Sequence, residues 1–130
     1  MCGIAGVIGP KLSETERNRI IDTMRHRGPD GDGCYAYKNV HLLHTRLAII
    51  DPQRGAQPMI LEWAGERYVM VYNGELYNTA ELRSELTALG HRFDTKSDTE
   101  VLLHAYAQWQ EQALNRLNGI FAFAVWHEHE

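Results

Sequence analysis

The chain has 130 residues, of which 44% are hydrophobic and 23% charged, as is typical of one globular domain with its own core. Its formal net charge of −4 provides no basic surface for nucleic acid, and no run of about 18 apolar residues is present to span a membrane. The two cysteines, Cys2 and Cys34, have neither metal-ligand spacing nor the number needed for a disulfide framework. We therefore expect a reducing compartment, the cytoplasm.

Apolar patterns and breaker residues divide the first half of the chain into strands, one helix and loops. The helix is expected to begin at Ser13, because Ser13 and Glu16 have the spacing of a capping box and apolar residues then recur at helical intervals. Glycine and proline predict a loop for the segment HRGPDGDG. In chain order we predict a buried strand over residues 3–8, this helix, the loop over 26–33, strands over 34–37 and 40–50, and a turn over 55–58.

The second half of the chain adds two helices between two apolar strands. The run YVMVY is β-branched and aromatic, as in a buried strand, and it leads directly into Asn73-Gly74. A last apolar strand ends four residues before the chain does, so we expect a mixed α and β domain that is incomplete at its C-terminus. In chain order we predict a strand over residues 68–72, a helix from Asn78 with Gly90 as its C-cap, a helix from Ser97, and a strand over 120–126.

Cys2 is the most informative residue of the sequence. Removal of the initiator methionine before a small residue leaves Cys2 with both a thiol and a free α-amine. An α-amine has an ordinary pKa of about 7.7–8.0, so it suits a general base held beside a sulfur nucleophile without any histidine. Position alone favours the alternative, a small structural residue at the start of a buried strand. The residues described next favour the nucleophile.

Three other places carry residue types that suit a substrate of such a nucleophile. Asn73 and Gly74 could donate N–H groups to an oxyanion, although Asn-Gly is also a strong signal for a hairpin turn. Arg46 interrupts an apolar strand, where it could bind a substrate carboxylate or simply face outward. Asp98 could bind a substrate ammonium or cap a helix. The seven histidines show no metal-binding pattern.

Six segments, taken in order, resemble the class II glutamine amidotransferases, whose nucleophile is an N-terminal residue. Within that class the chain is most similar to glutamine-hydrolysing asparagine synthetase, and the resemblance covers essentially the whole chain. The segments are MCGIAGVIG at the start, MRHRGPDGDG at 24–33, HTRLAIIDP at 44–52, YNGELYN at 72–78, TKSDTEVLLHAY at 95–106 and LNGIFAFAVW at 117–126.

The resemblance implies a role for each candidate residue. Cys2 attacks the side-chain amide of glutamine once Met1 is removed, and its own α-amine is the base. Asn73 and Gly74 stabilise the oxyanion, and Arg27 orders the site around Cys2. The implied substrate-binding residues are Arg46 for the α-carboxylate, Leu47, Ala48, Ile49 and Ile50 for the adjoining wall, and Glu75 and Asp98 for the α-ammonium.

The resemblance also implies the fold and the partners. The expected fold is α+β, a four-layer αββα sandwich of the N-terminal nucleophile hydrolase type, incomplete at the C-terminus. Residues 1–130 would form the glutaminase domain, with its C-terminal part and the synthetase domain absent. Glutamine hydrolysis needs no metal or cofactor, and ATP and magnesium belong to the synthetase domain. The expected partners are L-glutamine and a synthetase domain or subunit that receives ammonia, with no nucleic acid and no membrane; a homo-oligomer is left open.

Two other hypotheses remain at this point. The chain could be a non-catalytic fragment that binds glutamine without turnover. It could also be the glutaminase domain of another class II amidotransferase, with a sugar-phosphate or phosphoribosyl acceptor. The segments RLAIID and SDTEV favour the asparagine synthetase branch by resemblance alone.

Overall fold

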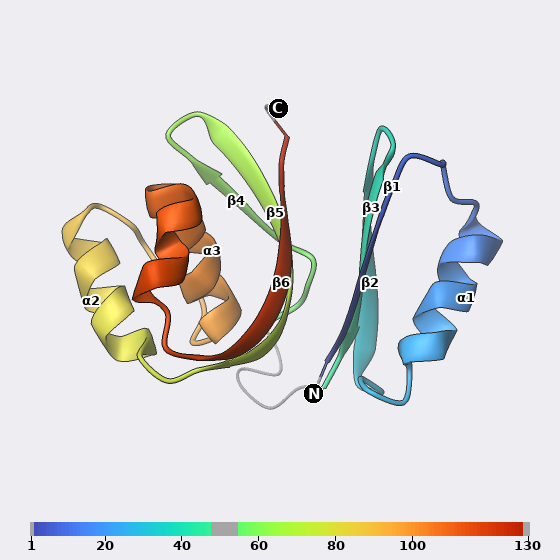
Figure 1. The fold of residues 1–130 in the computed structure, drawn as a ribbon, viewed down its shortest axis with the longest axis horizontal. Coiled ribbons are helices and arrows are strands. Elements are labelled where there is room, and N and C mark those ends of the chain that lie inside the picture. The colour runs from blue at the N-terminus through green and yellow to red at the C-terminus, as the bar shows by residue number, and fades with distance from the viewer. Residues whose placement is uncertain (1, 48–54, 129–130) are drawn as a thin grey trace.

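The computed structural model describes residues 2–47 and 55–128, and its elements form four layers. Two antiparallel three-stranded sheets face each other in the middle, with one helix outside the first sheet and the remaining helices outside the second (Figure 1). The α+β sandwich with αββα layers expected from the sequence is therefore confirmed.

The first sheet has the order β1-β3-β2 and is covered by a single helix. That helix has the predicted capping box: Ser13 Oγ accepts from the Glu16 N–H at 3.1 Å, and the Glu16 carboxylate accepts from the Ser13 N–H at 2.9 Å. These elements are β1 (Gly3–Ile8), α1 (Glu14–Met24), β2 (Gly31–Tyr37) and β3 (Val40–Arg46).

The second sheet has the order β4-β5-β6 and lies against the helices of the C-terminal half. The predicted cap of the third helix is present, since Ser97 Oγ accepts from the Glu100 N–H at 3.3 Å. The elements are β4 (Met59–Trp63), β5 (Glu66–Leu76), α2 (Thr79–Ala88), α3 (Asp98–Trp109), the 3-10 helix η1 (Gln110–Arg116) and β6 (Gly119–His127).

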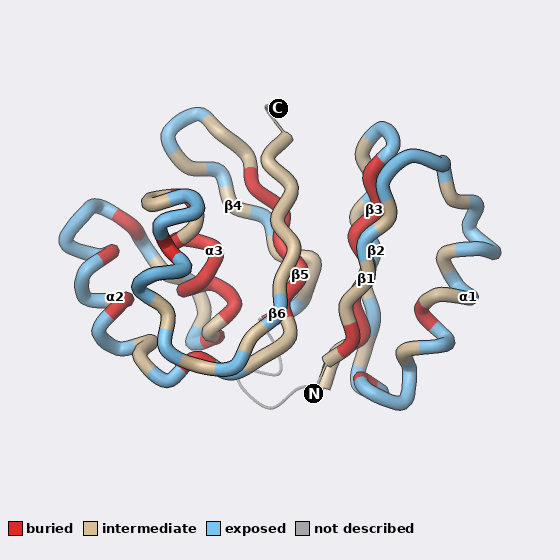
Figure 2. Tube along the Cα trace, viewed as in Figure 1, coloured by how far each residue is buried: buried red, intermediate tan, exposed pale blue. Residues whose placement is uncertain are grey.

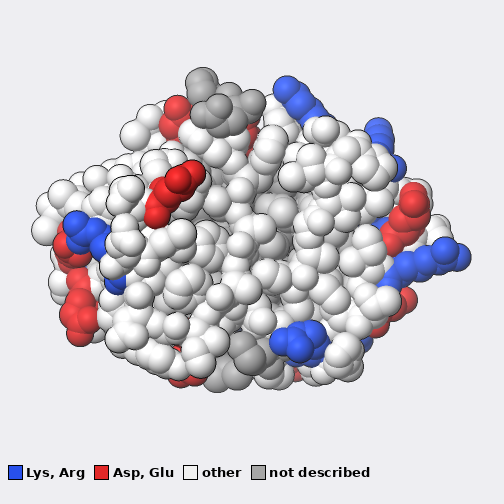
Figure 3. Space-filling view, in the orientation of Figure 1, with Lys and Arg blue, Asp and Glu red and all other residues white. Residues whose placement is uncertain are grey.

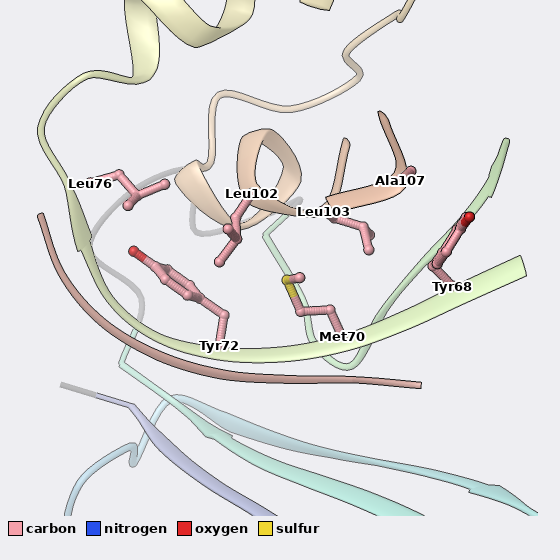
Figure 4. Packing of buried hydrophobic residues seen from close by; sticks show 7 residues of the cluster. All are labelled: Tyr68, Met70, Tyr72, Leu76, Leu102, Leu103 and Ala107. Carbon is pink, nitrogen blue, oxygen red and sulfur yellow. The ribbon is translucent and has the colours of Figure 1, made fainter. Parts of the chain in front are cut away.

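Strand β5 is the centre of the molecule and is buried on both faces. Tyr68, Met70 and Tyr72 point toward α3, where Leu102 and Leu103 pack against them (Figure 4). The alternate residues Val69 and Val71 belong to a second cluster with Val40 and Leu42 of the first sheet. Burial on both faces explains why the sequence of this strand is continuously apolar and does not alternate.

Burial and charge follow the layers. Buried positions concentrate on β3, β5 and α3, whereas the outward sides of α1 and α2 are exposed (Figure 2). In the view of Figure 3, charged side chains lie mainly toward the two ends of the molecule, and the band between them is largely uncharged.

Four details differ from the sequence predictions. Residues 31–33 are not loop but the start of β2, because they pair with residues 44–46 of β3. The strand over 3–8 is correct, but it is mostly not buried, since β1 is an edge strand and Ile8 is 72% exposed. Strand β3 ends at Arg46, and residues 48–50 of the predicted strand lie outside the described residues. Strand β4 and the 3-10 helix were not predicted.

Candidate active site

A pocket of about 220 Å³ opens where the start of β1, the end of β3, the end of β5 and the start of α3 come together. It contains all of the described site residues predicted from the sequence except Arg27, while Ala48, Ile49 and Ile50 lie outside the described residues. Its lining is formed by Cys2, Arg46, Leu47, Gly55, Gln57, Tyr72, Asn73, Gly74, Glu75, Ser97, Asp98 and Thr99.

Strand pairing explains why Cys2 and Arg46 share this pocket. Gly3 of β1 pairs with Thr45 of β3 in an antiparallel ladder. The residue before Gly3 and the residue after Thr45 therefore lie at the same end of the sheet. The nucleophile candidate and the carboxylate-binding candidate, 44 positions apart in the sequence, thus become neighbours through backbone pairing.

Cys2 forms hydrogen bonds with Leu47 and Arg27. Its thiol donates to the Leu47 carbonyl oxygen at 3.8 Å. The Leu47 backbone N–H donates to Cys2 Sγ at 3.3 Å, and Arg27 Nε donates to the Cys2 carbonyl oxygen at 3.2 Å. The half-buried thiol is thus oriented by the backbone that follows β3, and its main chain is held by a guanidinium. Arg27 does not line the pocket but contacts its nucleophile candidate from the outside.

The loop that contains Arg27 packs directly against β3. A Cβ atom at Gly28 would overlap the backbone of Thr45 and Arg46, so only glycine permits this approach. The Asp30 N–H donates to the Arg46 carbonyl at 2.9 Å on the other side of the loop. The glycine and proline of the RGPD sequence therefore bring Arg27 close to Cys2.

Asn73 and Gly74 lie inside strand β5 and not in a hairpin turn. They pair with Ala122 and Phe121 of β6, so the alternative interpretation of Asn-Gly as a turn is wrong. Asn73 follows Val69 and Val71 at intervals of two, which directs it toward the first sheet, where Cys2 is located. A Cβ atom at Gly74 would overlap the backbone of β6, so this position requires glycine for close packing.

Asp98 is the first residue of α3, immediately after the N-cap Ser97. Its Oδ2 atom accepts from the Tyr72 hydroxyl at 2.8 Å and from the Leu76 backbone N–H at 3.2 Å. Asp98 is therefore not the cap, and its carboxylate is held against β5. Burial, followed by the hydrogen bond to Asp98, raises the pKa of Tyr72 far above its ordinary value, so the phenol stays protonated and keeps donating.

The charges of the pocket are separated in a way that suits a free amino acid. Arg46 comes from the first sheet, whereas Asp98 and the exposed Glu75 come from α3 and β5 of the second half. A guanidinium binds a carboxylate in a bidentate fashion, and carboxylates bind an ammonium. One cation and two anions lining the same cavity match the α-carboxylate and α-ammonium groups of an amino acid.

Sequence reasoning did not find several residues of the pocket, among them Gln57, Tyr72 and Thr99. Gln57 occurs in a turn before Pro58, and its partners are 15 and 42 positions away, so no local pattern marks it. Tyr72 was noted as the end of an apolar strand and as the first residue of the segment YNGELYN, but it was given no role in the site. Within residues 2–47 and 55–128, no group of three or more His, Cys, Asp or Glu side chains is arranged to hold a metal ion. Helices in the same part of the chain are too short or too polar to cross a membrane.

Comparison with curated sequences finds close relatives among the asparagine synthetases. Glutamine-hydrolysing asparagine synthetase 3 of Bacillus subtilis (strain 168) is 48% identical over 98% of this chain. Asparagine synthetase 1 of the same bacterium is 42% identical over the whole chain, and asparagine synthetase 2 of rice, Oryza sativa subsp. japonica, is 43% identical over 96% of it. The chain spans about a fifth of the length of these relatives, 22%, 21% and 21% respectively.

Comparison with solved structures confirms the fold. The glutamine phosphoribosylpyrophosphate amidotransferase of B. subtilis in complex with ADP and GMP superposes with a TM-score of 0.82 over 98% of this chain and 35% of its own, at 21% identity. A structure described as the allosteric regulatory enzyme of purine biosynthesis gives a TM-score of 0.83 over 98% of this chain and 36% of its own, at 22% identity.

The family assignment rests on the whole chain and not on a single motif. The sequence model of the glutamine amidotransferase domain matches residues 1–130. The relatives and the fold agree with that match, and the pocket brings the motif residues together. The chain therefore belongs to the glutamine amidotransferase domain family.

Proposed function

We propose that this chain hydrolyses L-glutamine to glutamate and ammonia, with Cys2 as the nucleophile. The observation that carries the proposal is one pocket containing the Cys2 thiol, the Asn73-Gly74 pair, and separated charges at Arg46 and Asp98. A thiol beside a candidate oxyanion site suits acyl transfer, and the charges suit the amino-acid end of glutamine.

The proposed chemistry needs only groups of the chain and water. After Met1 is removed, the α-amine of Cys2 takes the thiol proton and Sγ bonds to the side-chain carbonyl carbon of glutamine. The Asn73 side-chain amide and the Gly74 backbone N–H donate to the tetrahedral oxyanion. The protonated amine gives its proton to the departing nitrogen, the C–N bond breaks and ammonia leaves. Water then attacks the thioester as the amine accepts a proton from it. The carbon–sulfur bond breaks, the amine returns this proton to the sulfur, and glutamate is released.

Substrate recognition would be divided between the two halves of the pocket. Arg46 would bind the α-carboxylate, and Asp98 with Glu75 would bind the α-ammonium. Arg27 would order Cys2 through the hydrogen bond to its carbonyl oxygen. Leu47 contacts the Cys2 sulfur, and with Ala48, Ile49 and Ile50, which lie outside the described residues, it would form the adjoining wall.

We further propose that the ammonia serves the synthesis of asparagine from aspartate in an adjoining synthetase domain or subunit. The relatives that are 42–48% identical are named as glutamine-hydrolysing asparagine synthetases. The phosphoribosyl alternative is supported only by structures that are 21–22% identical, a likeness that concerns the fold. ATP and magnesium would act in the synthetase part and not in this pocket.

The acceptor can be tested by the coding sequence downstream of residue 130. An in-frame continuation encoding an ATP-binding domain, and asparagine formation from aspartate, ATP and glutamine by the full product, is the expected result. A phosphoribosyl acceptor domain, with phosphoribosylamine as the product, would overturn the assignment.

The glutaminase activity is tested by Cys2→Ala. We expect this variant to release no ammonia from glutamine, because it keeps the α-amine but lacks the sulfur. Mass spectrometry should find that the active wild-type protein begins at Cys2. Cys34→Ser is the matched control, since Cys34 is exposed on β2 outside the pocket and should keep full activity.

Two outcomes would contradict the proposal. Ammonia release by Cys2→Ala at the wild-type rate would exclude Cys2 as the nucleophile. Saturable glutamine binding in calorimetry, without ammonia from a wild-type chain that begins at Cys2, would favour the non-catalytic binding module.

A further inference from the structure

The side chain of Gln57 connects the two elements that carry the predicted oxyanion donors and the predicted ammonium ligand. Gln57 Oε1 accepts from the Tyr72 backbone N–H at 2.6 Å. Gln57 Nε2 donates to Thr99 Oγ1 at 3.1 Å. Both polar ends of the carboxamide are therefore bonded to the protein, although the residue lines the pocket.

The first contact takes the place of a backbone hydrogen bond between β4 and β5 that is missing at this position of the second sheet. The ladder between β4 and β5 begins with Met59 paired to Met70, and the same register would put Gln57 opposite Tyr72. The backbone has left the sheet at this point, and the Gln57 side chain accepts the Tyr72 N–H in its place. Because Tyr72 is only 3% exposed, loss of this acceptor would leave a buried N–H without a partner.

The second contact reaches the first turn of α3. Thr99 follows Asp98 directly and is buried, so a bond to its hydroxyl fixes the start of the helix. Tyr72 in turn precedes Asn73 and Gly74. One carboxamide thus sets the distance between the strand segment that carries the oxyanion donors and the helix end that carries the carboxylate.

The main chain of Gln57 is held from the opposite side by the first sheet. A Cβ atom at Gly33 of β2 would overlap the Gln57 carbonyl oxygen, so the two backbones are in direct contact. Gln57 therefore touches β2, β5 and α3 at once, with its backbone against one sheet and its side chain between the other sheet and its helix.

We propose that Gln57 is a positioning residue for glutamine hydrolysis, which places Asn73 and Gly74 relative to Cys2 by holding Tyr72 and Thr99. The inference rests on the proposed glutaminase activity. It predicts an effect mainly on kcat, because a displaced oxyanion donor weakens binding of the transition state. Asp98 keeps its own donors, Tyr72 Oη and Leu76 N, so substrate binding should change little.

The test compares Gln57→Leu with Gln57→Glu in chains that begin at Cys2. Leucine has a similar volume but cannot accept the Tyr72 N–H, whereas glutamate retains an acceptor for it and can also accept from the Thr99 hydroxyl. We expect Gln57→Leu to lower kcat by about 10- to 100-fold, as for catalytic groups misplaced by up to 1 Å, with little change in KM. Gln57→Glu should restore most of the lost kcat. Calorimetric stoichiometry of L-glutamate binding counts the folded pockets and corrects kcat for inactive protein.

Thr99→Val supplies a second variant that breaks only the contact to the helix. It should lower kcat less than Gln57→Leu, and it should have almost no further effect in a Gln57→Leu background, because the contact is already absent. Wild-type kcat in Gln57→Leu, or full additivity of the two substitutions, would overturn the proposal.

A direct measurement separates this inference from the glutaminase assignment. Hydrogen exchange of the Tyr72 amide, followed by NMR, should be faster in Gln57→Leu than in wild type and close to wild type in Gln57→Glu. If wild type releases no ammonia, the proposed function fails while this exchange still reports on the contact. Unchanged exchange in Gln57→Leu, in an active enzyme, would overturn the role of Gln57 alone.

Discussion

Asp98 and Cys2 are both held in place by hydrogen bonds to the protein. Asp98 uses Oδ2 for two donors from β5, one from the phenol of Tyr72 and one from the Leu76 backbone. Cys2 is fixed through its sulfur and its carbonyl oxygen. Residues arranged in this way before a ligand arrives lose little entropy when it binds, which favours both affinity and reaction rate.

Tyr72→Phe tests the support of Asp98. The variant keeps the ring that packs against α3 but removes the hydroxyl that donates to the carboxylate. A hydrogen bond of this kind contributes about 0.5–1.5 kcal/mol or somewhat more to a charged group, so we expect KM for glutamine to rise about two- to tenfold with a smaller change in kcat. Steady-state kinetics measure both constants. Tyr106→Phe, on α3 outside the pocket, is the control, and an equal change there would show a general packing effect.

The site residues proposed from the sequence came partly from local chemistry and partly from the family resemblance. A cysteine next to the initiator methionine and an arginine in an apolar strand are unusual for their places in the chain. Asp98 is ordinary at a helix start, and the resemblance gave it its proposed role. Gln57 gives no such signal, because its importance comes from partners supplied by β5 and α3. Contacts of this kind depend on tertiary structure, which one sequence does not reveal.

At the scale of elements, two serines cap two helices that differ in their relation to the pocket. Ser13 is exposed and begins α1, which lies outside the first sheet. Ser97 is buried, begins α3 and lines the pocket beside Asp98. The same local hydrogen bond therefore supports stability alone in one helix and also the position of a carboxylate in the other.

Substitution of the two caps should separate these effects. Ser13→Ala should lower the free energy of unfolding by about 1 kcal/mol and leave kinetics unchanged. Ser97→Ala should destabilise by at least as much and also weaken L-glutamate binding, because the first turn of α3 moves with Asp98. Urea denaturation and calorimetry measure the two quantities. A change of KM in Ser13→Ala, or unaltered glutamate binding in Ser97→Ala, would contradict this assignment.

The strand segments that the sequence analysis did not predict have conflicting local patterns. In β4 the residues Met59, Leu61 and Trp63 pack inward, but the outward position Ile60 is also apolar and obscures the alternation. At the start of β2 the glycines suggested a loop, whereas Gly33 is required because the Gln57 backbone approaches it. Capped helices and the continuous run of β5 were predictable, because their signals lie within a few neighbouring residues.

At the scale of the whole molecule, two buried histidines lie in different layers, one in the first sheet and one in the helices outside the second sheet. His44 of β3 is 1% exposed and His104 of α3 is 4% exposed. His104 Nδ1 lies 2.7 Å from His91 Nδ1. Burial lowers the pKa of each of these two imidazoles to about 4, so both are neutral at physiological pH.

These histidines predict the pH dependence of stability. Their pKa values of about 4 in the folded state lie below the ordinary value of 6.5, so the unfolded chain binds protons first as the pH falls. The free energy of unfolding should therefore decrease between pH 6.5 and pH 4, by at most about 1.4 kcal/mol per pH unit for each histidine. Urea denaturation at several pH values measures the slope.

Variants at single histidines test the source of that slope. His104→Gln should make it shallower, whereas His26→Gln, at an exposed position in the loop before β2, should leave it unchanged. An equal slope in wild type and in His104→Gln would show that His104 does not contribute.

The hydrogen bonds to residue 2 have a consequence for the order of maturation. The bonds to Leu47 use the sulfur of Cys2 and the bond to Arg27 uses its carbonyl oxygen, so none of them uses its nitrogen. Excision of Met1 changes only that nitrogen, so the hydrogen bonds that hold Cys2 are the same before and after Met1 is removed. Under the proposed mechanism, a precursor that retains Met1 would hold Cys2 in the same position but would have no free α-amine to act as the base, so an aminopeptidase that removes Met1 would activate it.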